Sequence, residues 1–160
     1  ARTAPPVPQA SLAKSQATLT LASPKSSHGE QKISEFPKSP IYGKWKFFKM
    51  AADGIDMPPR DQRLELTFSF DEEGVSTLYW SYDGGNSFCE RKGRYLFQDG
   101  FLVDEIYWAN PKNKFDCAAD PDMQVGRRST SKVDLSDDEF VLHIPFSNKE
   151  ILYYWKKLEE

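Results

Sequence analysis

Residues 64–70 alternate strictly between apolar and polar side chains. The apolar side chains of this segment fall on one face of an extended chain: Leu64, Leu66, Phe68 and Phe70. A repeat of two residues is typical of a β-strand with one buried face and one solvated face. Residues 140–146 show the same alternation, with the following positions on one face: Phe140, Leu142, Ile144 and Phe146. We therefore predict that both segments are strands whose apolar faces point inward.

Short apolar segments separated by turn residues continue along most of the chain. We predict strands at residues 42–50, 64–70, 75–82, 87–97, 101–108, 125–135, 140–146 and 151–158. Short turns join most neighbours, and no segment has a helical period. A chain of hairpins is an antiparallel meander, and a meander of about eight strands hides its two edges best by closing. The predicted fold is all-β, an eight-stranded antiparallel up-and-down β-barrel.

Two connections are much longer than the turns and span residues 51–63 and 109–124. Long loops in a compact domain usually serve as lids, as binding loops or as flexible segments. Pro58 and Pro59 exclude a helix or a central strand from the first of them. Gly93 predicts a bulge inside its own strand.

Residues 1–40 differ in composition from the rest of the chain. They contain six of the 11 prolines, seven serines and few large apolar residues. Such a segment has too little apolar surface to offset the entropy lost on ordering its backbone. We predict a disordered, flexible N-terminal tether at residues 1–40 and a single barrel domain at residues 41–160. The tether has five Lys/Arg against two Asp/Glu, and the domain has sixteen against twenty-two, so the acidic domain argues against a nucleic-acid partner.

The sequence has no apolar run of roughly 18 residues, so no membrane span is expected. No signal peptide is recognisable, and the sequence begins at Ala1 rather than at Met. We interpret the chain as a processed form of an exported protein. The expected location is periplasmic or extracellular, with attachment to the cell envelope through the N-terminus.

The two cysteines, Cys89 and Cys117, leave a disulfide open at this stage. An even number of cysteines in an exported protein favours a bond. If the two cysteines lie on strands that are two apart in a meander, however, roughly 9–10 Å separates them, which is twice the spacing between strands. A disulfide needs Cα atoms within about 7 Å of each other. The bond therefore requires that the loop carrying Cys117 folds back towards Cys89.

The predicted barrel resembles the lipocalin (calycin) group, in the short form of bacterial exported proteins. Gly43-Lys44-Trp45 matches the Gly-x-Trp pattern that opens the first strand in that group, and a long loop follows. The last strand carries a basic residue, Lys156 or Lys157. The resemblance implies that a lysine, which we assign to Lys156, covers the indole of Trp45 where the first and last strands meet. Such a cation–π contact contributes about 0.5–2 kcal/mol.

The predicted ligand site is the barrel lumen, with the first long loop over its mouth. The apolar side chains assigned to the lumen wall are Leu66, Phe68, Phe70, Leu78, Trp80, Tyr82, Leu142 and Ile144. Ile55 and Met57 in the loop are expected to gate the mouth. The resemblance implies an arginine that holds a fatty-acid carboxylate, and Arg91 and Arg127 are the candidates. An alternative, in which the charged side chains all point outward into water, stays open.

Two functions from different classes remain open. The first is an exported barrel that binds a small apolar or amphipathic ligand, such as a fatty acid or a lipid-like molecule, in its lumen. The alternative is a solid-core protein-interaction or cell-envelope structural module that uses residues 51–63 and 109–124 as its contact surface. Aromatic residues make up 14% of the chain, and they suit either a ligand cavity or a filled barrel.

Catalysis and metal binding find little support in the sequence. No motif places a Ser or Cys nucleophile beside His143, so we expect a protein that is not an enzyme. Asp116, Asp120 and Asp122 cluster in the second long loop, but they lack the twelve-residue pattern of a calcium loop. We expect a solvated acidic loop with no metal, and no cofactor elsewhere.

Overall fold

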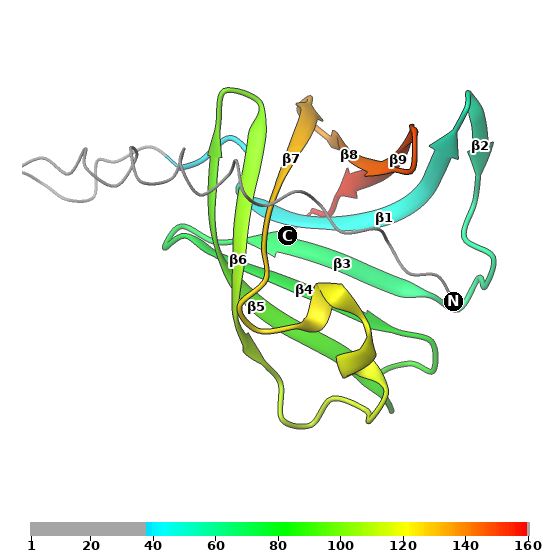
Figure 1. The fold of residues 1–160 in the computed structure, drawn as a ribbon, viewed down its shortest axis with the longest axis vertical. Coiled ribbons are helices and arrows are strands. Elements are labelled where there is room, and N and C mark those ends of the chain that lie inside the picture. Colours follow the sequence, from blue (N-terminus) through cyan, green and yellow to red (C-terminus); the bar gives the residue numbers. More distant parts are fainter. Residues whose placement is uncertain (1–37, 160) are drawn as a thin grey trace, which may run out of the picture.

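The computed structural model describes residues 38–159 of the protein. Residues 1–37 of the predicted tether lie outside the described residues, so the division into tether and domain stays a prediction. The described chain forms one sheet of nine antiparallel strands, which Figure 1 shows curled into a barrel. The strands are β1 (Gly43–Ala52), β2 (Ile55–Met57), β3 (Glu65–Phe70), β4 (Val75–Ser81), β5 (Phe88–Gln98), β6 (Phe101–Ala109), β7 (Arg128–Leu135), β8 (Glu139–Phe146) and β9 (Lys149–Lys157). Two short 3₁₀ helices, η2 (Cys117–Ala119) and η3 (Pro121–Met123), lie between β6 and β7. Within this part of the chain, no helix has the length and apolar character needed to cross a membrane.

Eight of these strands make up the barrel wall. From β3 to β9 each strand pairs antiparallel with the next one in the chain. β1 pairs with β3 on one side and with β9 on the other, so the sheet closes on itself. The β1–β9 ladder runs from Trp45 opposite Lys157 to Ala52 opposite Ile151. This closure confirms the predicted eight-stranded antiparallel up-and-down barrel, and it pairs strand edges that would otherwise be exposed.

The first long connection is shorter than predicted, because it contains β2. β1 continues to Ala52, and β2 turns back and pairs with its last residues. The turn consists of Asp53 and Gly54, which have φ angles of 53° and 77°. Asp-Gly is a favoured pair for a two-residue hairpin turn, in which both central residues need positive φ. Asp53-Gly54 is therefore the local sequence signal for this hairpin.

One end of the barrel is filled by aromatic side chains. Trp45, Phe70 and Phe140 are at most 1% exposed, and we refer to these three as the aromatic plug. The Trp45 and Phe140 ring centres are 5.0 Å apart in an edge-to-face arrangement. Trp45 Nε1 donates a hydrogen bond to the carbonyl oxygen of Ile41 at 3.0 Å. The plug therefore satisfies its polar group while it closes this end of the lumen.

The lysine above Trp45 is Lys157, and the assignment to Lys156 was wrong. Lys157 Nζ lies 5.2 Å from the centre of the Trp45 ring system, and the two residues are direct partners in the β1–β9 ladder. Lys156 lies instead over Phe48, with its Nζ 5.1 Å from the ring centre. The reason is the two-residue alternation of a strand, which puts neighbouring side chains on opposite faces. Gly43 makes room for the contact, since a Cβ there would lie 2.9 Å from Lys157 Cε.

Cys89 and Cys117 form a disulfide with their Cα atoms 5.6 Å apart. Cys89 is in β5, and Cys117 begins η2 in the connection between β6 and β7. This connection folds back against β5, where the backbone N–H of Lys114 donates to the carbonyl oxygen of Phe88 at 3.1 Å. The condition for the bond, a loop that returns to Cys89, is therefore met.

The turn between β4 and β5 is organised by the Asp83 carboxylate. It accepts hydrogen bonds from the backbone N–H of Ser87 at 2.9 Å and from the Ser87 hydroxyl at 2.7 Å. These bonds, the backbone one foremost, lower the pKa of Asp83 to about 2, because they favour the ionised carboxylate.

Candidate functional site

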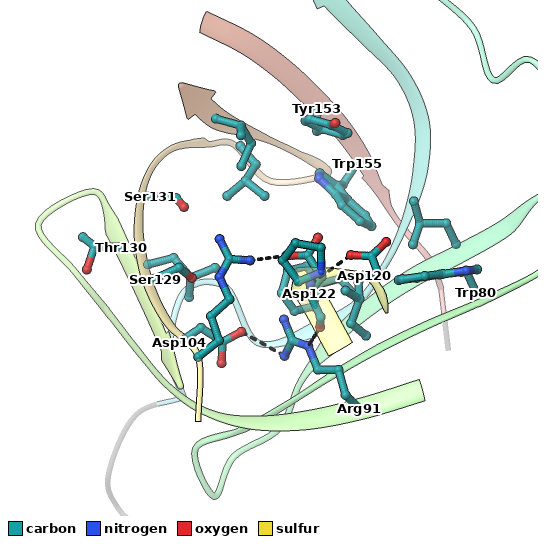
Figure 2. Close-up of a pocket in the computed structure, with 18 of the residues that line it drawn as sticks. Trp80, Arg91, Asp104, Asp120, Asp122, Ser129, Thr130, Ser131, Tyr153 and Trp155 are labelled. Carbon is teal, nitrogen blue, oxygen red and sulfur yellow. Dashed lines mark hydrogen bonds and ion pairs between the residues drawn. The ribbon is translucent and has the colours of Figure 1, made fainter. Parts of the chain in front are cut away.

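A cavity of about 520 Å³ lies inside the barrel, and the plug residues Trp45, Phe70 and Phe140 do not line it. Its volume falls within the roughly 300–1,000 Å³ that is usual for small-molecule sites. Figure 2 shows the residues around it, which come from strands on several sides of the barrel and from η3. The barrel therefore contains both a packed aromatic plug and a separate open space.

The apolar wall of the cavity contains most of the residues that the sequence assigned to the lumen. The assigned residues that line it are Leu66, Phe68, Leu78, Trp80, Tyr82, Leu142 and Ile144. Tyr82 lies at the rim, where 41% of it is exposed. Tyr153 and Trp155 of β9 also belong to this wall. The sequence pattern of their strand did not predict which of its faces points inward.

Three residues assigned to the ligand site, Phe70, Ile55 and Met57, do not line the cavity. Phe70 belongs to the plug, because β3 runs the length of the barrel and its last inward side chain reaches the closed end. Ile55 is 64% exposed, since β2 pairs along β1 instead of folding across the mouth. Met57 ends the same short strand. Phe146, also predicted inward, is 40% exposed.

Arg91 points into the barrel and is already neutralised. Its Nη1 donates to Asp104 Oδ2 at 3.0 Å, and its Nε donates to the Asp122 carbonyl oxygen at 3.2 Å (Figure 2). The same Nη1 donates to Ser76 Oγ at 3.2 Å. The guanidinium also covers the face of Phe68, with Cζ 5.3 Å from the ring centre. Burial raises the pKa of Asp104, and the Arg91 charge pulls that pKa back only in part. Arg91 and Asp104 thus form a buried ion pair with further hydrogen bonds, the arrangement that buried charges require.

Gly93 makes this buried cluster sterically feasible. Ser76 Oγ donates to Asp104 Oδ1 at 2.8 Å, and the two side chains meet above Gly93. A Cβ at this position would collide with Asp104 Oδ1 and would lie 3.0 Å from Ser76 Oγ. The β5–β6 register shifts between Lys92 and Gly93, which confirms the bulge predicted there.

The second arginine, Arg127, lies at the cavity wall beside η3. Its Nη1 donates to Asp122 Oδ1 at 3.0 Å. Asp120 caps η3, since its Oδ1 accepts the backbone N–H of Asp122 at 2.9 Å. Burial raises the pKa of Asp120, and the bond from the Asp122 N–H offsets this shift only in part. Asp116 lies away from the cavity lining and pairs with Lys114 at 3.7 Å.

The acidic loop does not form a cation cage. Across residues 38–159, no group of three or more His, Cys, Asp or Glu side chains is placed to share a metal ion. His143 also lies outside the cavity lining. Its Nε2 is 2.7 Å from Asp134 Oδ2, and its Nδ1 is 3.2 Å from Glu150 Oε2.

The cavity wall between β7 and β8 carries hydroxyl groups. The β7–β8 ladder stops at Lys132 opposite His143, and the cavity is lined beyond that point by Ser129, Thr130 and Ser131. Tyr153 of β9 also lines the cavity. Burial raises the pKa of Tyr153, and the negative charges of Asp122 and Asp120 raise it further. Sequence reasoning missed these residues, because the strand signal over residues 125–135 was weak.

Strand order and closure decide the type of fold. Eight barrel strands follow chain order, hairpins join most of them, and the first strand pairs with the last. The domain is a lipocalin-like β-barrel. No protein-family model and no curated protein matches its sequence.

Several solved structures are similar to the barrel. An uncharacterized protein from Bacteroides eggerthii DSM 20697 is 18% identical, covers 74% of this chain and 99% of its own, and gives a TM-score of 0.50. A lipocalin-like protein from Bacteroides uniformis ATCC 8492 is 16% identical over 75% of this chain and 100% of its own, with a TM-score of 0.49. A designed fluorescence-activating β-barrel is 10% identical over 74% of this chain and 94% of its own, with a TM-score of 0.38. At such identities the similarity concerns the fold alone.

Proposed function

We propose that the barrel binds a small amphipathic molecule in its cavity. The observation that carries this proposal is a space of about 520 Å³ with two chemically different walls. Strands β3, β4, β8 and β9 supply mainly apolar and aromatic side chains, whereas the charged and hydroxyl groups come mainly from β5, β6, β7 and the η3 region, which also contribute Leu102 and Pro121. A ligand tail on the apolar wall gains about 25 cal/mol for each Å² of apolar surface removed from water. A polar head finds hydrogen-bond partners on the opposite wall.

The proposal is tested by binding and by blocking the cavity. We expect an environment-sensitive apolar fluorophore to brighten with the protein, and a long-chain alcohol to displace it. Leu66→Trp places a larger side chain in the cavity, whereas Thr67→Trp introduces the same side chain at a neighbouring position of β3 that does not line the cavity. The first variant should lose at least about tenfold in affinity, and the second should bind like the wild type. Equal binding by the wild type and Leu66→Trp would contradict the proposal.

We propose as a second candidate function that residues 109–124 contact a protein partner. Phe115 in this connection is 95% exposed, and the Cys89–Cys117 disulfide ties the connection to the barrel. Aromatic side chains are enriched in protein–protein interfaces, so an exposed Phe on an anchored loop suits a protein contact. This alternative predicted a solid core, whereas the barrel contains a cavity of about 520 Å³. Phe115→Asp should abolish co-purification of a stoichiometric partner, and Ala118→Asp on the same loop should not.

We also propose that the protein works in an oxidising compartment, periplasmic or extracellular. The disulfide supports this location, because such bonds are rare in reducing compartments. Rapid alkylation of whole cells before lysis, followed by mass measurement, is the test. A protein that is alkylated on both Cys89 and Cys117 would contradict the proposal.

A further inference from the structure

The charged groups at the cavity do not balance. Arg91 pairs with Asp104 at 3.0 Å, and Arg127 pairs with Asp122 at 3.0 Å. Asp120 also lines the cavity, but it forms no salt bridge with any residue in the range 38–159. If all five groups are ionised, the cavity wall carries one negative charge more than it has positive charges.

Asp120 is the carboxylate of this wall that is not paired with an arginine among residues 38–159, and Trp155 Nε1 is a buried donor of the same wall that has no hydrogen-bond partner among them. Asp120 Oδ1 accepts the backbone N–H of Asp122, whereas Oδ2 has no hydrogen-bond partner among the described residues. Trp155 and Trp80 line the same cavity as Asp120 (Figure 2). Tyr153 lines the same cavity, and its pKa is raised by burial first and then by the negative charges of Asp122 and Asp120. A cation in this cavity would meet the opposite charge of a carboxylate and could also make cation–π contacts with the aromatic lining.

We infer that the polar head of the ligand is a cation, of the alkylammonium class, that pairs with Asp120. An anionic head, such as a fatty-acid carboxylate, would find Arg91 already paired with Asp104 and Arg127 already paired with Asp122. It would also approach the negative charge of Asp120, and like charges at short range repel. The inference rests on the proposed function, because it describes the head group of the molecule that occupies the same cavity.

The test compares three probes that share one tail and differ in the charge of the head. Decylamine is cationic near neutral pH, decanol is neutral and decanoate is anionic, and each is titrated by displacement of the apolar fluorophore. Wild-type protein should bind decylamine at least about tenfold more tightly than decanoate. Asp120→Asn should lower the affinity for decylamine at least about tenfold and leave the affinity for decanol unchanged. Asn keeps the Oδ1 acceptor that caps η3, so this variant preserves the local fold.

Asp116→Asn is the matched control, because it removes the same charge from the same loop outside the cavity lining. It should leave decylamine binding unchanged. Equal losses in Asp116→Asn and Asp120→Asn would overturn the inference, since a diffuse attraction to an acidic surface would then explain the binding. Wild-type binding of decanoate at least as tight as that of decylamine would also overturn it, even if Asp120→Asn failed to fold.

The two proposals fail in different ways. If decanol and decanoate bind in a manner that Leu66→Trp blocks, and decylamine binds no better, the amphipathic site stands and the cationic head is wrong. If none of the three probes displaces the fluorophore, the cavity does not bind such ligands and both proposals fall.

Discussion

Reduction of the Cys89–Cys117 disulfide should destabilise the barrel strongly. The cysteines are 28 positions apart in the sequence. The chain-entropy model for a loop of this length gives about 12 cal/mol/K, or about 3.6 kcal/mol at room temperature. Both residues are at most 3% exposed, so reduction also leaves two thiols in a packed site. Backbone hydrogen bonds such as Lys114 to Phe88 survive reduction, and they keep part of the connection in place.

The measurement is urea unfolding of the oxidised and the reduced wild-type protein under otherwise identical conditions. We expect the free energy of unfolding to fall by about 3–4 kcal/mol on reduction. Amide exchange should quicken over residues 110–127, because the bond ties this connection to β5. The double variant Cys89→Ala/Cys117→Ala should show no further effect of the reductant. Equal free energies of unfolding for oxidised and reduced wild type, with no thiols titrating in the oxidised sample, would refute the reasoning.

Three further predictions concern the buried ion pair, the aromatic plug and one turn. Arg91→Met should cost about 3–5 kcal/mol of unfolding free energy, because it leaves the Asp104 carboxylate buried and unpaired. Arg91→Met/Asp104→Leu should recover much of this loss, and a single variant that costs nothing in urea unfolding would contradict the pairing. Trp45→Ala should cost about 3–5 kcal/mol, since it removes a large side chain that is 1% exposed, and an unchanged melting temperature would argue against its role. The folded-state pKa of Asp83 is lowered from 3.8 to about 2, so its stabilisation is complete above pH 3.8 and is lost as pH falls through about 2. Asp83→Asn should therefore flatten the dependence of the urea midpoint on pH in that window, and an unaltered acid profile would show that the Ser87 hydrogen bonds do not matter.

Local sequence patterns determined the strands and much of the apolar wall. The alternation over residues 64–70 is sufficient to predict β3 and its inward face, because a strand places every second side chain on the same side. Gly93 likewise marked the irregularity between β5 and β6. The hairpin sequence also predicted a closed barrel, since closure is the usual way for a meander of this length to pair its edges. Fold class and seven of the assigned lumen residues therefore followed from short-range information.

Only the tertiary structure decided how distant residues pair. Whether Lys156 or Lys157 covers Trp45 depends on the register between the first and last strands, and a shift of one residue reverses the answer. The disulfide depends on the path of a long connection that no local pattern describes. The neutralisation of Arg91 by Asp104 depends on the bulged β5–β6 register and on the space above Gly93. The cavity itself is the volume that remains after all these side chains are packed. That volume and the charge left unpaired at Asp120 are properties of the closed barrel as a whole, so no single stretch of sequence specifies them.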